Sequence, residues 1–492
     1  MKPDYLFVNQ DEIFTPSFIQ TKDTIFGNAT FVTQKAFQEL AFNAKKFPKK
    51  FLKLLNAYAI VAPNSINPTE KTIFEFEDGL PIPMGVESPN SLIVGPSGVG
   101  KTSKFTLPLL FDSVRNGRSN VLVCTGGNQS ISQALTVVKK AGGEKSKTYV
   151  FDLRKTFPYN PFIDLVSFRA ASVFWESIAK IVGAGCRDES AWVYNQATEN
   201  LAHLTKFFII RGYSLHYLRK TVLSGSYEDV LQHQVDGGVL TAFVKSLKID
   251  NRNSDTVQST MREMTAWIDI HSGVFEYPSF SFYQFVKNGG NIIVNLPIHL
   301  LDVLKPYVTA MIGQLVNIFD LVSNESATGC IPHQTVINLD ELATCPLSGF
   351  TSLLHVNRKQ GWSVAGGCQS VSQIHEIFGQ NANTILAGFQ SKICLPQSDH
   401  ITATYFSNCS GKASMITPEF LRSKNGFIQG DRGVISQRQL FLDSDITAPK
   451  KHPLLGQPSL VITPELIYQA YITSIFDHGL FNFSENNFVS VL

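Results

Sequence analysis

Residues 95–102 form a glycine-rich run that ends in a lysine and a threonine, a combination suited to holding a phosphate chain. The run reads Gly95-Pro96-Ser97-Gly98-Val99-Gly100-Lys101-Thr102 and fits G-x-x-x-x-G-K-[ST]. Glycines let the backbone curl, so that several N–H groups point at one phosphate. Lys101 would place its ammonium on the β and γ phosphates, and the Thr102 hydroxyl would bind Mg²⁺. We predict that this run, with Ser103 after it, binds ATP.

A second candidate segment carries two adjacent carboxylates after an apolar run. Val336-Ile337-Asn338-Leu339 precedes Asp340 and Glu341. A buried parallel strand delivers such carboxylates to its carboxyl end, where α/β sheets bind ligands. Asp340 is predicted to hold Mg²⁺, directly or through water. Glu341 is predicted to polarise the attacking water.

Two further polar residues follow in positions useful to hydrolysis. Arg358, in Asn357-Arg358-Lys359-Gln360, could reach the γ-phosphate of a neighbouring subunit and stabilise the transition-state charge. Gln369, just past the apolar run at 363–366, could sense the γ-phosphate or orient water. Each has an ordinary alternative: Arg358 as a surface arginine on a helix, and Gln369 as a residue that caps the next helix.

These residues need a sheet that brings distant strand ends together. Continuous apolar runs separated by helical stretches predict a parallel sheet covered on both faces. The runs are Ser91–Val94, Val121–Cys124, Thr148–Phe151, Asn291–Leu296, Thr335–Leu339, Ser363–Gly366 and Ser391–Leu395. A helix over Lys101–Arg115 would follow the phosphate-binding run. The predicted fold class is α/β.

Three regions lie outside this alternation. Residues 166–275 have helical periodicity, for example at Ala170–Val182, Glu189–Arg211 and Ser254–Ile270, and predict an inserted all-α domain. Thr463-Pro464 predicts the start of an amphipathic helix with Ile467, Tyr471 and Ile475 on one side. Residues 37–62 look helical, with lysines around Pro48 that form either a solvated face or a patch for DNA phosphates or lipid headgroups.

Composition narrows the function classes. With 492 residues, two or three structural units are expected. The 42 Lys+Arg nearly balance the 40 Asp+Glu, so nucleic acid would be contacted by a local patch or channel. The 7 cysteines form no C-x-x-C pair, which favours reduced thiols over disulfides or zinc. No apolar stretch is long enough to span a bilayer, and we expect a cytoplasmic protein.

The segments that carry these residues resemble a known family. Gly98–Cys124, Leu339–Ala343 (LDELA) and Asn357–Gly411 are similar to the type IV coupling proteins of the TraG/TraD-like kind. These are hexameric ATPases that feed DNA or protein into type IV secretion machines during conjugation. The resemblance spans about residues 26–440. The stretch 369–411 is specific to the family, whereas the phosphate-binding run is shared with many others.

The resemblance implies a RecA-like P-loop domain with a mainly parallel central sheet and an inserted all-α domain. Residue by residue, Lys101 and Thr102 match the phosphate-loop pair, and Asp340 and Glu341 match the acidic pair. Arg358 matches the family's arginine, and Gln369 its third-motif glutamine. The implied partners are single-stranded DNA bound without sequence preference, relaxase or effector proteins, and inner-membrane secretion components. A homo-hexamer is implied, with a monomer as the alternative when substrate is absent.

The sequence departs from the family in three places. An acidic Asp-x-Lys-Gly-Glu run is often found after the second strand, and Thr125-Gly126-Gly127-Asn128 stands here instead. The family usually begins with transmembrane helices, which are absent, so that peripheral attachment to the bacterial inner membrane through a partner is expected. An asparagine that often follows the 380s helix is replaced near Gly388-Phe389.

The predicted domains follow from these boundaries. They are an N-terminal segment at 1–85, a nucleotide-binding domain at 86–165 and 276–445, an all-α insertion at 166–275 and an extension at 446–492. The favoured function is a substrate-translocating ATPase. A receptor that uses nucleotide only as a switch to dock protein substrates is the alternative. A small-molecule P-loop kinase is weaker, because such kinases are usually shorter and lack the acidic pair with a downstream Arg and Gln.

Overall fold

The computed structural model describes most of the chain from Asn90 onward and three short strands before it. The described residues are 20–21, 29–31, 59–66, 90–142, 147–155, 157–165, 167–183, 191–225, 227, 251–271, 280–345, 350–422, 428–449, 451, 456–464, 467–472 and 474–477. They fold as two compact units. The first holds the described residues up to Asp112 and from Ala365 on, and the second is Ser113–Val364.

The second unit is built on four parallel strands in the order β8-β5-β7-β6. Their bounds are Thr335–Leu339 (β8), Ser119–Cys124 (β5), Asn291–Asn295 (β7) and Thr148–Asp152 (β6). Every residue of β5, β7 and β8 is buried, as expected for a sheet covered on both faces. These four strands were predicted, and their observed bounds differ by no more than two residues at either end.

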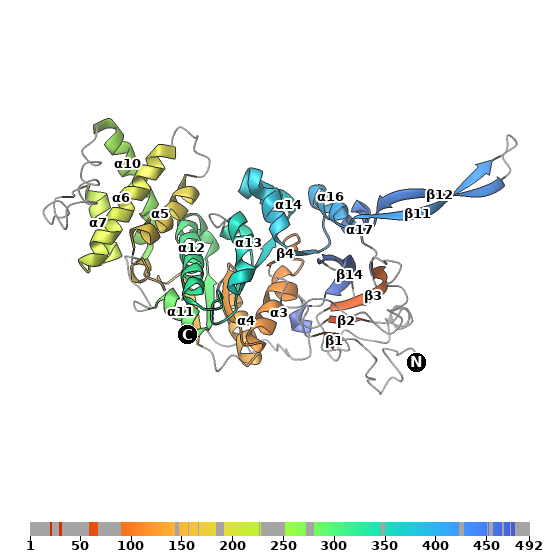
Figure 1. The fold of residues 1–492 in the computed structure, drawn as a ribbon, viewed down its shortest axis with the longest axis horizontal. Helices are drawn as coiled ribbons and strands as arrows, with labels where there is room; N and C mark the ends of the chain where they lie inside the picture. Colours follow the sequence, from red (N-terminus) through yellow and green to blue (C-terminus); the bar gives the residue numbers. More distant parts are fainter. Residues whose placement is uncertain are drawn as a thin grey trace. The chain divides into compact units, whose positions relative to one another are not determined.

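Helices account for most of the remaining second unit (Figure 1). Their bounds are Gly127–Lys140 (α4), Phe168–Val182 (α5), Ala191–Ile210 (α6), Leu215–Ser224 (α7), Asn251–Met264 (α10), Phe282–Asn288 (α11), Leu301–Glu325 (α12) and Phe350–Gln360 (α13). A 3₁₀ segment at Ala266–His271 follows α10.

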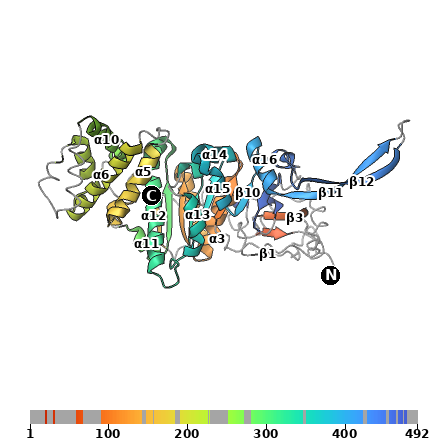
Figure 2. The same cartoon turned by 45° about the horizontal axis from the view of Figure 1, so that its top comes forward.

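Between β6 and β7, the described regular elements are all helical, and Figure 2 shows α5, α6 and α10 gathered together. Trp175 of α5 is fully buried, and its indole N–H donates to the Thr205 hydroxyl of α6 at 2.8 Å. Ser167 begins α5 as an N-cap that accepts from the N–H of Ala170. The domain boundaries predicted at 166 and 275 remain a proposal.

The first unit is built on a mixed sheet in the order β1-β2-β3-β14-β13-β10-β4. The strands are Gln20–Thr21 (β1), Ala29–Phe31 (β2), Ala59–Ile66 (β3), Ile467–Ile472 (β14), Ser459–Ile462 (β13), Ser391–Cys394 (β10) and Asn90–Val94 (β4). β4 and β10 pair in parallel, whereas β10, β13, β14 and β3 pair antiparallel in turn. The division between the units falls within α3 (Leu107–Arg115) and β9 (Trp362–Cys368).

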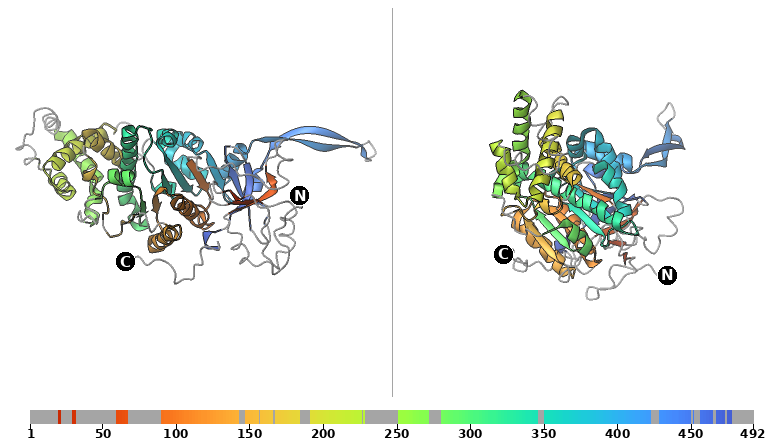
Figure 3. Two further views of the ribbon diagram at one scale, coloured as in Figure 1. Left: turned by 60° about the horizontal axis from the view of Figure 1, so that its bottom comes forward. Right: turned by 60° about the vertical axis from the view of Figure 1, so that its left-hand side comes forward.

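The remaining helices of the first unit are short. They are Val371–Phe378 (α14), Ala382–Gly388 (α15), His400–Cys409 (α16) and Asp443–Thr447 (α17). β11 (Lys412–Arg422) and β12 (Ile428–Gln439) form a separate two-stranded antiparallel sheet (Figure 3, in blue). The predicted helix at Lys101–Arg115 is present, with an opening π-helical turn at Thr102–Thr106 before α3.

Two helix predictions need correction. The helix expected after Thr463-Pro464 is wrong, because Ile467–Ile472 is strand β14. β14 is hydrogen-bonded to β13 on one side and to β3 on the other. The consecutive residues Ala470, Tyr471 and Ile472 are all buried, as expected for a strand covered on both faces of its sheet. The helix expected at 37–62 is wrong at its end, where Ala59–Ile66 is β3. Residues 37–58, with the lysines around Pro48, lie outside the described ranges.

The predicted α/β fold class is confirmed, with a mainly parallel sheet in the second unit and a mixed one in the first. Among the described helices, none combines the length and apolar character that a membrane-spanning segment requires.

Candidate functional site

The phosphate-binding run of the first unit is a loop between β4 and the helix that begins at Thr102. Gly95 follows β4, and its N–H donates to the Cys368 carbonyl at the end of β9 at 3.1 Å. A Cβ at Gly95 would lie 2.9 Å from both Cβ and Cδ1 of Leu395, so only glycine fits here. The loop is thus held between the end of β9, at Cys368, and Leu395, which directly follows β10.

The loop curls because two of its glycines take conformations that other residues disfavour. Gly98 and Gly100 have φ values of 83° and 92°, in the left-handed region. The Lys101 ammonium lies back across the loop and donates to the carbonyls of Gly95 at 2.7 Å and Pro96 at 3.4 Å. A curled loop with its lysine folded over it fits a phosphate chain, whose oxygens would take the ammonium from these carbonyls.

Gln369 lies next to this loop, one residue after Cys368. Its N–H donates to Oε1 of Gln373 at 2.9 Å, and its carbonyl accepts from Nε2 of buried Gln397 at 3.0 Å. Its own side chain is exposed. Capping of α14 falls to Ser370, whose hydroxyl accepts from the N–H of Gln373, and not to Gln369. Sequence reasoning missed Gln397, which fixes the backbone of Gln369 from 28 residues away.

The acidic pair lies at the carboxyl end of β8 in the second unit. The N–H of Asp340 donates to the Val123 carbonyl of β5 at 3.0 Å. The backbone carbonyl of Glu341 accepts from the Thr344 hydroxyl at 2.7 Å. The side-chain oxygen Oε1 of Glu341 is buried. Both carboxylates therefore follow a rigid, fully buried strand, which fixes where their backbone leaves the sheet.

Other strand ends bring polar groups to the same edge. Cys124 ends β5, Asn295 ends β7 and Asp152 ends β6, so a polar row extends from Asp340 across the four strands. Burial raises the pKa of the Cys124 thiol, and the carboxylates of Asp340 and Asp152 raise it further. Cys124 therefore stays a neutral thiol between two charged strand ends.

Asp152 is the centre of a hydrogen-bond network that sequence reasoning did not find. Its Oδ1 accepts from Nε of Arg154 at 2.7 Å and from Nδ2 of Asn295 at 3.1 Å, and its Oδ2 accepts from Arg154 at 2.6 Å. Burial alone would raise the pKa of Asp152, but the hydrogen bonds from Arg154 and Asn295 outweigh it and lower the pKa. Asp152 is therefore held as a carboxylate.

The same network accounts for the departure at 125–128. Gly127 has a φ of 68° and donates its N–H to Oδ1 of Asn295 at 3.1 Å. The Oδ1 of Asn128 accepts from the Arg154 guanidinium. The segment that replaces the family's acidic run thus ties the start of α4 to the ends of β6 and β7. The available sequence signal was Asp152 directly after the predicted strand Thr148–Phe151 and Asn295 next to the end of the predicted strand Asn291–Leu296.

Arg358 lies near the end of α13, with its side chain exposed. Its backbone N–H donates to Oδ1 of buried Asn357 at 2.8 Å. Within the described ranges, its guanidinium makes no hydrogen bond or ion pair.

The structure thus places the predicted residues in two sets. The loop at 95–103 and Gln369 lie together in the first unit, and Asp340, Glu341 and Arg358 lie in the second. Assembly of both sets around one triphosphate stays a prediction. The described residues hold no cluster of three or more His, Cys, Asp or Glu side chains suited to a metal. Binding of Mg²⁺ by Thr102 and Asp340 stays a prediction, based on the oxygen ligands that this ion prefers.

Comparisons with known proteins match one segment of the chain to a family model and its fold to solved structures. Residues 334–448 match the family model described as the TraM recognition site of TraD and TraG. The fold is similar to that of the bacterial conjugative coupling protein TrwBΔN70, with a TM-score of 0.60 and 19% identity over 78% of this chain and 83% of that chain. No curated protein matches the chain.

Two further solved structures of TrwB contain nucleotide. The complex with ADP and Mg²⁺ has a TM-score of 0.59 at 19% identity, covering 78% of this chain and 84% of that chain. The complex with the non-hydrolysable ATP analogue ADPNP has a TM-score of 0.59 at 18% identity, covering 77% and 84%. At these identities the likeness shows the fold, which is RecA-like. The predicted resemblance to the type IV coupling proteins is confirmed.

Proposed function

We propose that this chain, which shares its fold and a recognition-site segment with coupling proteins, is an ATP hydrolase that recruits substrate to a type IV secretion channel. The substrate is single-stranded DNA, a relaxase or an effector protein. The match over residues 334–448 supports a relaxosome protein as partner. We further propose that the working form is a homo-hexamer held at the bacterial inner membrane by channel components, in which the exposed Arg358 of one subunit reaches the ATP of its neighbour.

The first unit supplies the phosphate-binding half of the site. The loop N–H groups from Gly98 to Lys101 and the start of the following helix would cradle the β and γ phosphates. The Lys101 ammonium would exchange its two carbonyl partners for phosphate oxygens. Thr102 and Asp340 would hold Mg²⁺, which when bound offsets the negative charge on the phosphates.

The second unit supplies the acid–base half. Glu341 would accept a proton from the attacking water and orient it toward the γ-phosphate. Arg358 of a neighbouring subunit would donate to the γ-phosphate oxygens in the transition state. The backbone of Gln369 is hydrogen-bonded to the side chains of Gln373 and Gln397. The Gln369 side chain would contact the γ-phosphate and couple its presence to α14. Coupling of hydrolysis to substrate movement would follow from closure of the subunit interface around ATP.

The observation that carries this proposal is the curled loop with left-handed Gly98 and Gly100 and the Lys101 ammonium folded across it. The test is ATP turnover of the full chain with and without single-stranded DNA. We expect turnover that DNA stimulates and that Lys101→Ala abolishes. Lys140→Ala, an exposed lysine at the end of α4, is the matched control and should turn over ATP like the wild type.

Two outcomes would contradict the proposal. An ATP turnover rate that single-stranded DNA does not change and that Lys101→Ala does not lower would contradict the proposal entirely. Negligible turnover in a chain that binds ATP and captures a relaxase or effector protein would replace it with the alternative, a receptor that nucleotide only switches.

A further inference from the structure

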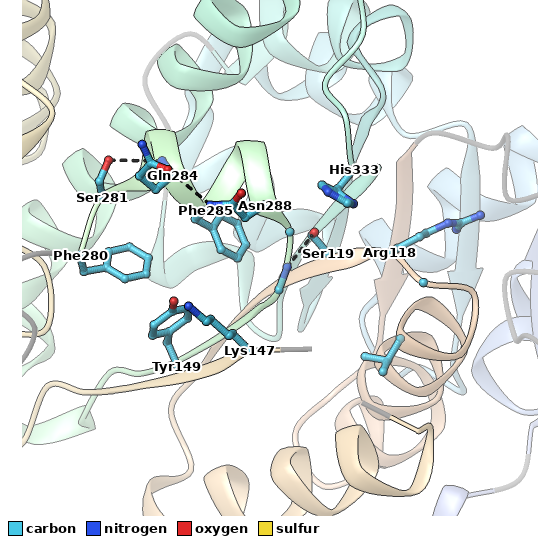
Figure 4. A pocket seen from close by; sticks show the side chains of 14 residues that line it. Arg118, Ser119, Lys147, Tyr149, Phe280, Ser281, Gln284, Phe285, Asn288 and His333 are labelled. Carbon is cyan, nitrogen blue, oxygen red and sulfur yellow. Dashed lines mark hydrogen bonds between the residues drawn. The ribbon is translucent and has the colours of Figure 1, made fainter. Parts of the chain in front are cut away.

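A cavity lies in the second unit, at the edge where its strands begin. It has a volume of about 650 Å³ and lies opposite the edge that carries Asp340 and Asp152. Its lining includes Arg118, Lys147, Tyr149, Gln284, Asn288 and His333 (Figure 4). None of the described residues that line it carries a carboxylate. Its size is in the range of small-molecule and cofactor sites.

The floor of the cavity is built by two glycines between α11 and β7. Gly289 and Gly290 have φ values of 72° and 143°. A Cβ on Gly289 would lie 3.0 Å from Cγ of His333, and one on Gly290 would lie 2.8 Å from the Lys147 carbonyl. The Gly290 N–H donates to the hydroxyl of buried Ser119 at 3.1 Å. The backbone thus passes closely under the cavity and is fixed there, so the cavity is part of the rigid sheet edge.

The cationic groups of the lining come from separate segments. Arg118 directly precedes β5, and Lys147 directly precedes β6. Figure 4 places them toward opposite ends of the cavity, with His333 between them on one wall. The order β5-β7-β6 separates their backbones by two strand spacings, about 10 Å. Arg118 and the exposed Lys147 supply two cationic side chains, and no described lining residue supplies a carboxylate, so the lining favours an anion long enough to reach both.

The rest of the lining suits a flat polar ring. The Tyr149 ring is half-buried and packs edge-on against Phe280, with ring centroids 4.8 Å apart. Gln284 and Asn288 present exposed amides from one face of α11, joined by a hydrogen bond of 3.4 Å. Aromatic rings stack on unpaired bases, and amides hydrogen-bond to base edges.

We propose that this cavity binds a phosphorylated nucleoside, either free or as one unit of a single-stranded nucleic acid. Arg118 and Lys147 hold the phosphate or its neighbours, Tyr149 contacts the base face, and Gln284 and Asn288 contact base edges. Inorganic phosphate would leave most of the volume and the aromatic wall unused. An acidic peptide would use the cations but not the ring and amides. Binding of a single-stranded nucleic acid at this cavity rests on the proposed function, whereas binding of a free phosphorylated nucleoside does not.

The test is binding to the full chain with ADP and Mg²⁺ in excess, so that the loop at 95–103 is occupied. The probes are AMP and a fluorescent single-stranded oligonucleotide, with inorganic phosphate and a poly-glutamate peptide as competitors. We expect Arg118→Gln and Lys147→Gln each to weaken binding about ten-fold at low salt. If the oligonucleotide binds, each should also lower the slope of log affinity against log salt by about 0.7.

Matched controls lie close by on the same unit. Arg115→Gln at the end of α3 and Lys140→Gln at the end of α4 remove exposed cations that do not line the cavity, and should not change binding. Tyr149→Leu should weaken AMP and oligonucleotide without changing the salt slope, because it removes a ring and no charge. Thermal melting of every variant checks that the chain is folded.

Each outcome has a definite meaning. Binding of AMP identifies a free nucleotide as the ligand, and binding of the oligonucleotide alone identifies the polymer. Binding that the cavity variants leave unchanged overturns the proposal, as does equal competition by inorganic phosphate or poly-glutamate. A chain that binds these probes here but hydrolyses no ATP would refute the proposed function and keep this site.

Discussion

Asn295→Asp tests the hydrogen-bond network at the carboxyl edge of the second unit. The change is nearly isosteric, but it replaces the amide that donates to Asp152 with a second carboxylate. The two oxygens would then lie about as far apart as the present N–O pair, 3.1 Å. At an effective dielectric constant of about 20, the repulsion at that distance is about 5 kcal/mol.

Protonation sets the actual cost. One carboxyl of the pair can avoid the repulsion by binding a proton. At about pH 8, protonating a carboxyl whose ordinary pKa is about 4 costs about 5 kcal/mol. We therefore expect the second unit to lose about 3–5 kcal/mol of unfolding free energy at about pH 8. The pair's pKa is raised in the folded state, so stability returns as the pH falls. The expected loss at about pH 5 is about 1–2 kcal/mol.

Urea unfolding followed by tryptophan fluorescence measures this change, because all 4 tryptophans lie within Ser113–Val364. Asn291→Asp is the matched control on the same strand. Asn291 is also buried, but its side chain hydrogen-bonds to Asn120 and Thr148, which carry no charge. A loss in Asn295→Asp that does not depend on pH, or that Asn291→Asp reproduces with the same pH dependence, would refute the network.

Three further changes test other parts of the structure. Gly95→Ala should weaken ATP binding about ten-fold or more, since its Cβ would lie 2.9 Å from Leu395 and overpacking costs about 1–3 kcal/mol; unchanged affinity by calorimetry would contradict the close approach. Arg358→Ala should lower turnover about 10³-fold in the assembled protein, with Lys359→Ala as control; mixing Arg358→Ala with Lys101→Ala protein should restore some turnover if the arginine acts between subunits. Asp399→Ala should speed hydrogen exchange in α16 and cost about 1 kcal/mol, because Asp399 caps that helix. Hydrogen bonds from Thr402 and Ser372 outweigh burial and lower the Asp399 pKa, so this contribution should be lost as the pH falls below about 4.

The sequence predicted the strands well where they are buried on both faces. Thr335–Leu339 is a short, largely apolar run with two carboxylates after it, and such a run needs no knowledge of its neighbours to be identified. The phosphate-binding loop was equally local, because its glycines, lysine and threonine are consecutive. The C-terminal strand β14 was missed because Ile467, Tyr471 and Ile475 also fit helical spacing. Only pairing with β13 and β3 decides between the two.

The network around Asp152 could not be predicted for a related reason. Asn295 lies 143 residues from Asp152, and their contact depends on β7 being the neighbour of β6. The apolar pattern of a strand does not specify its place in the sheet. Gly127, which has a positive φ, likewise donates its N–H to Asn295, 168 residues away. The sequence identified the carboxyl edge as the place for polar groups, but not which of them meet.

The account depends most directly on Glu341 acting on an ATP molecule held by the loop at 95–103. The decisive measurement is ATP binding and phosphate release by Glu341→Gln, compared in one preparation with the wild type. The account predicts binding within about three-fold of the wild type and phosphate release at least about 100-fold slower. Phosphate release at the wild-type rate would show that the carboxylates of β8 and the phosphate loop do not share one site.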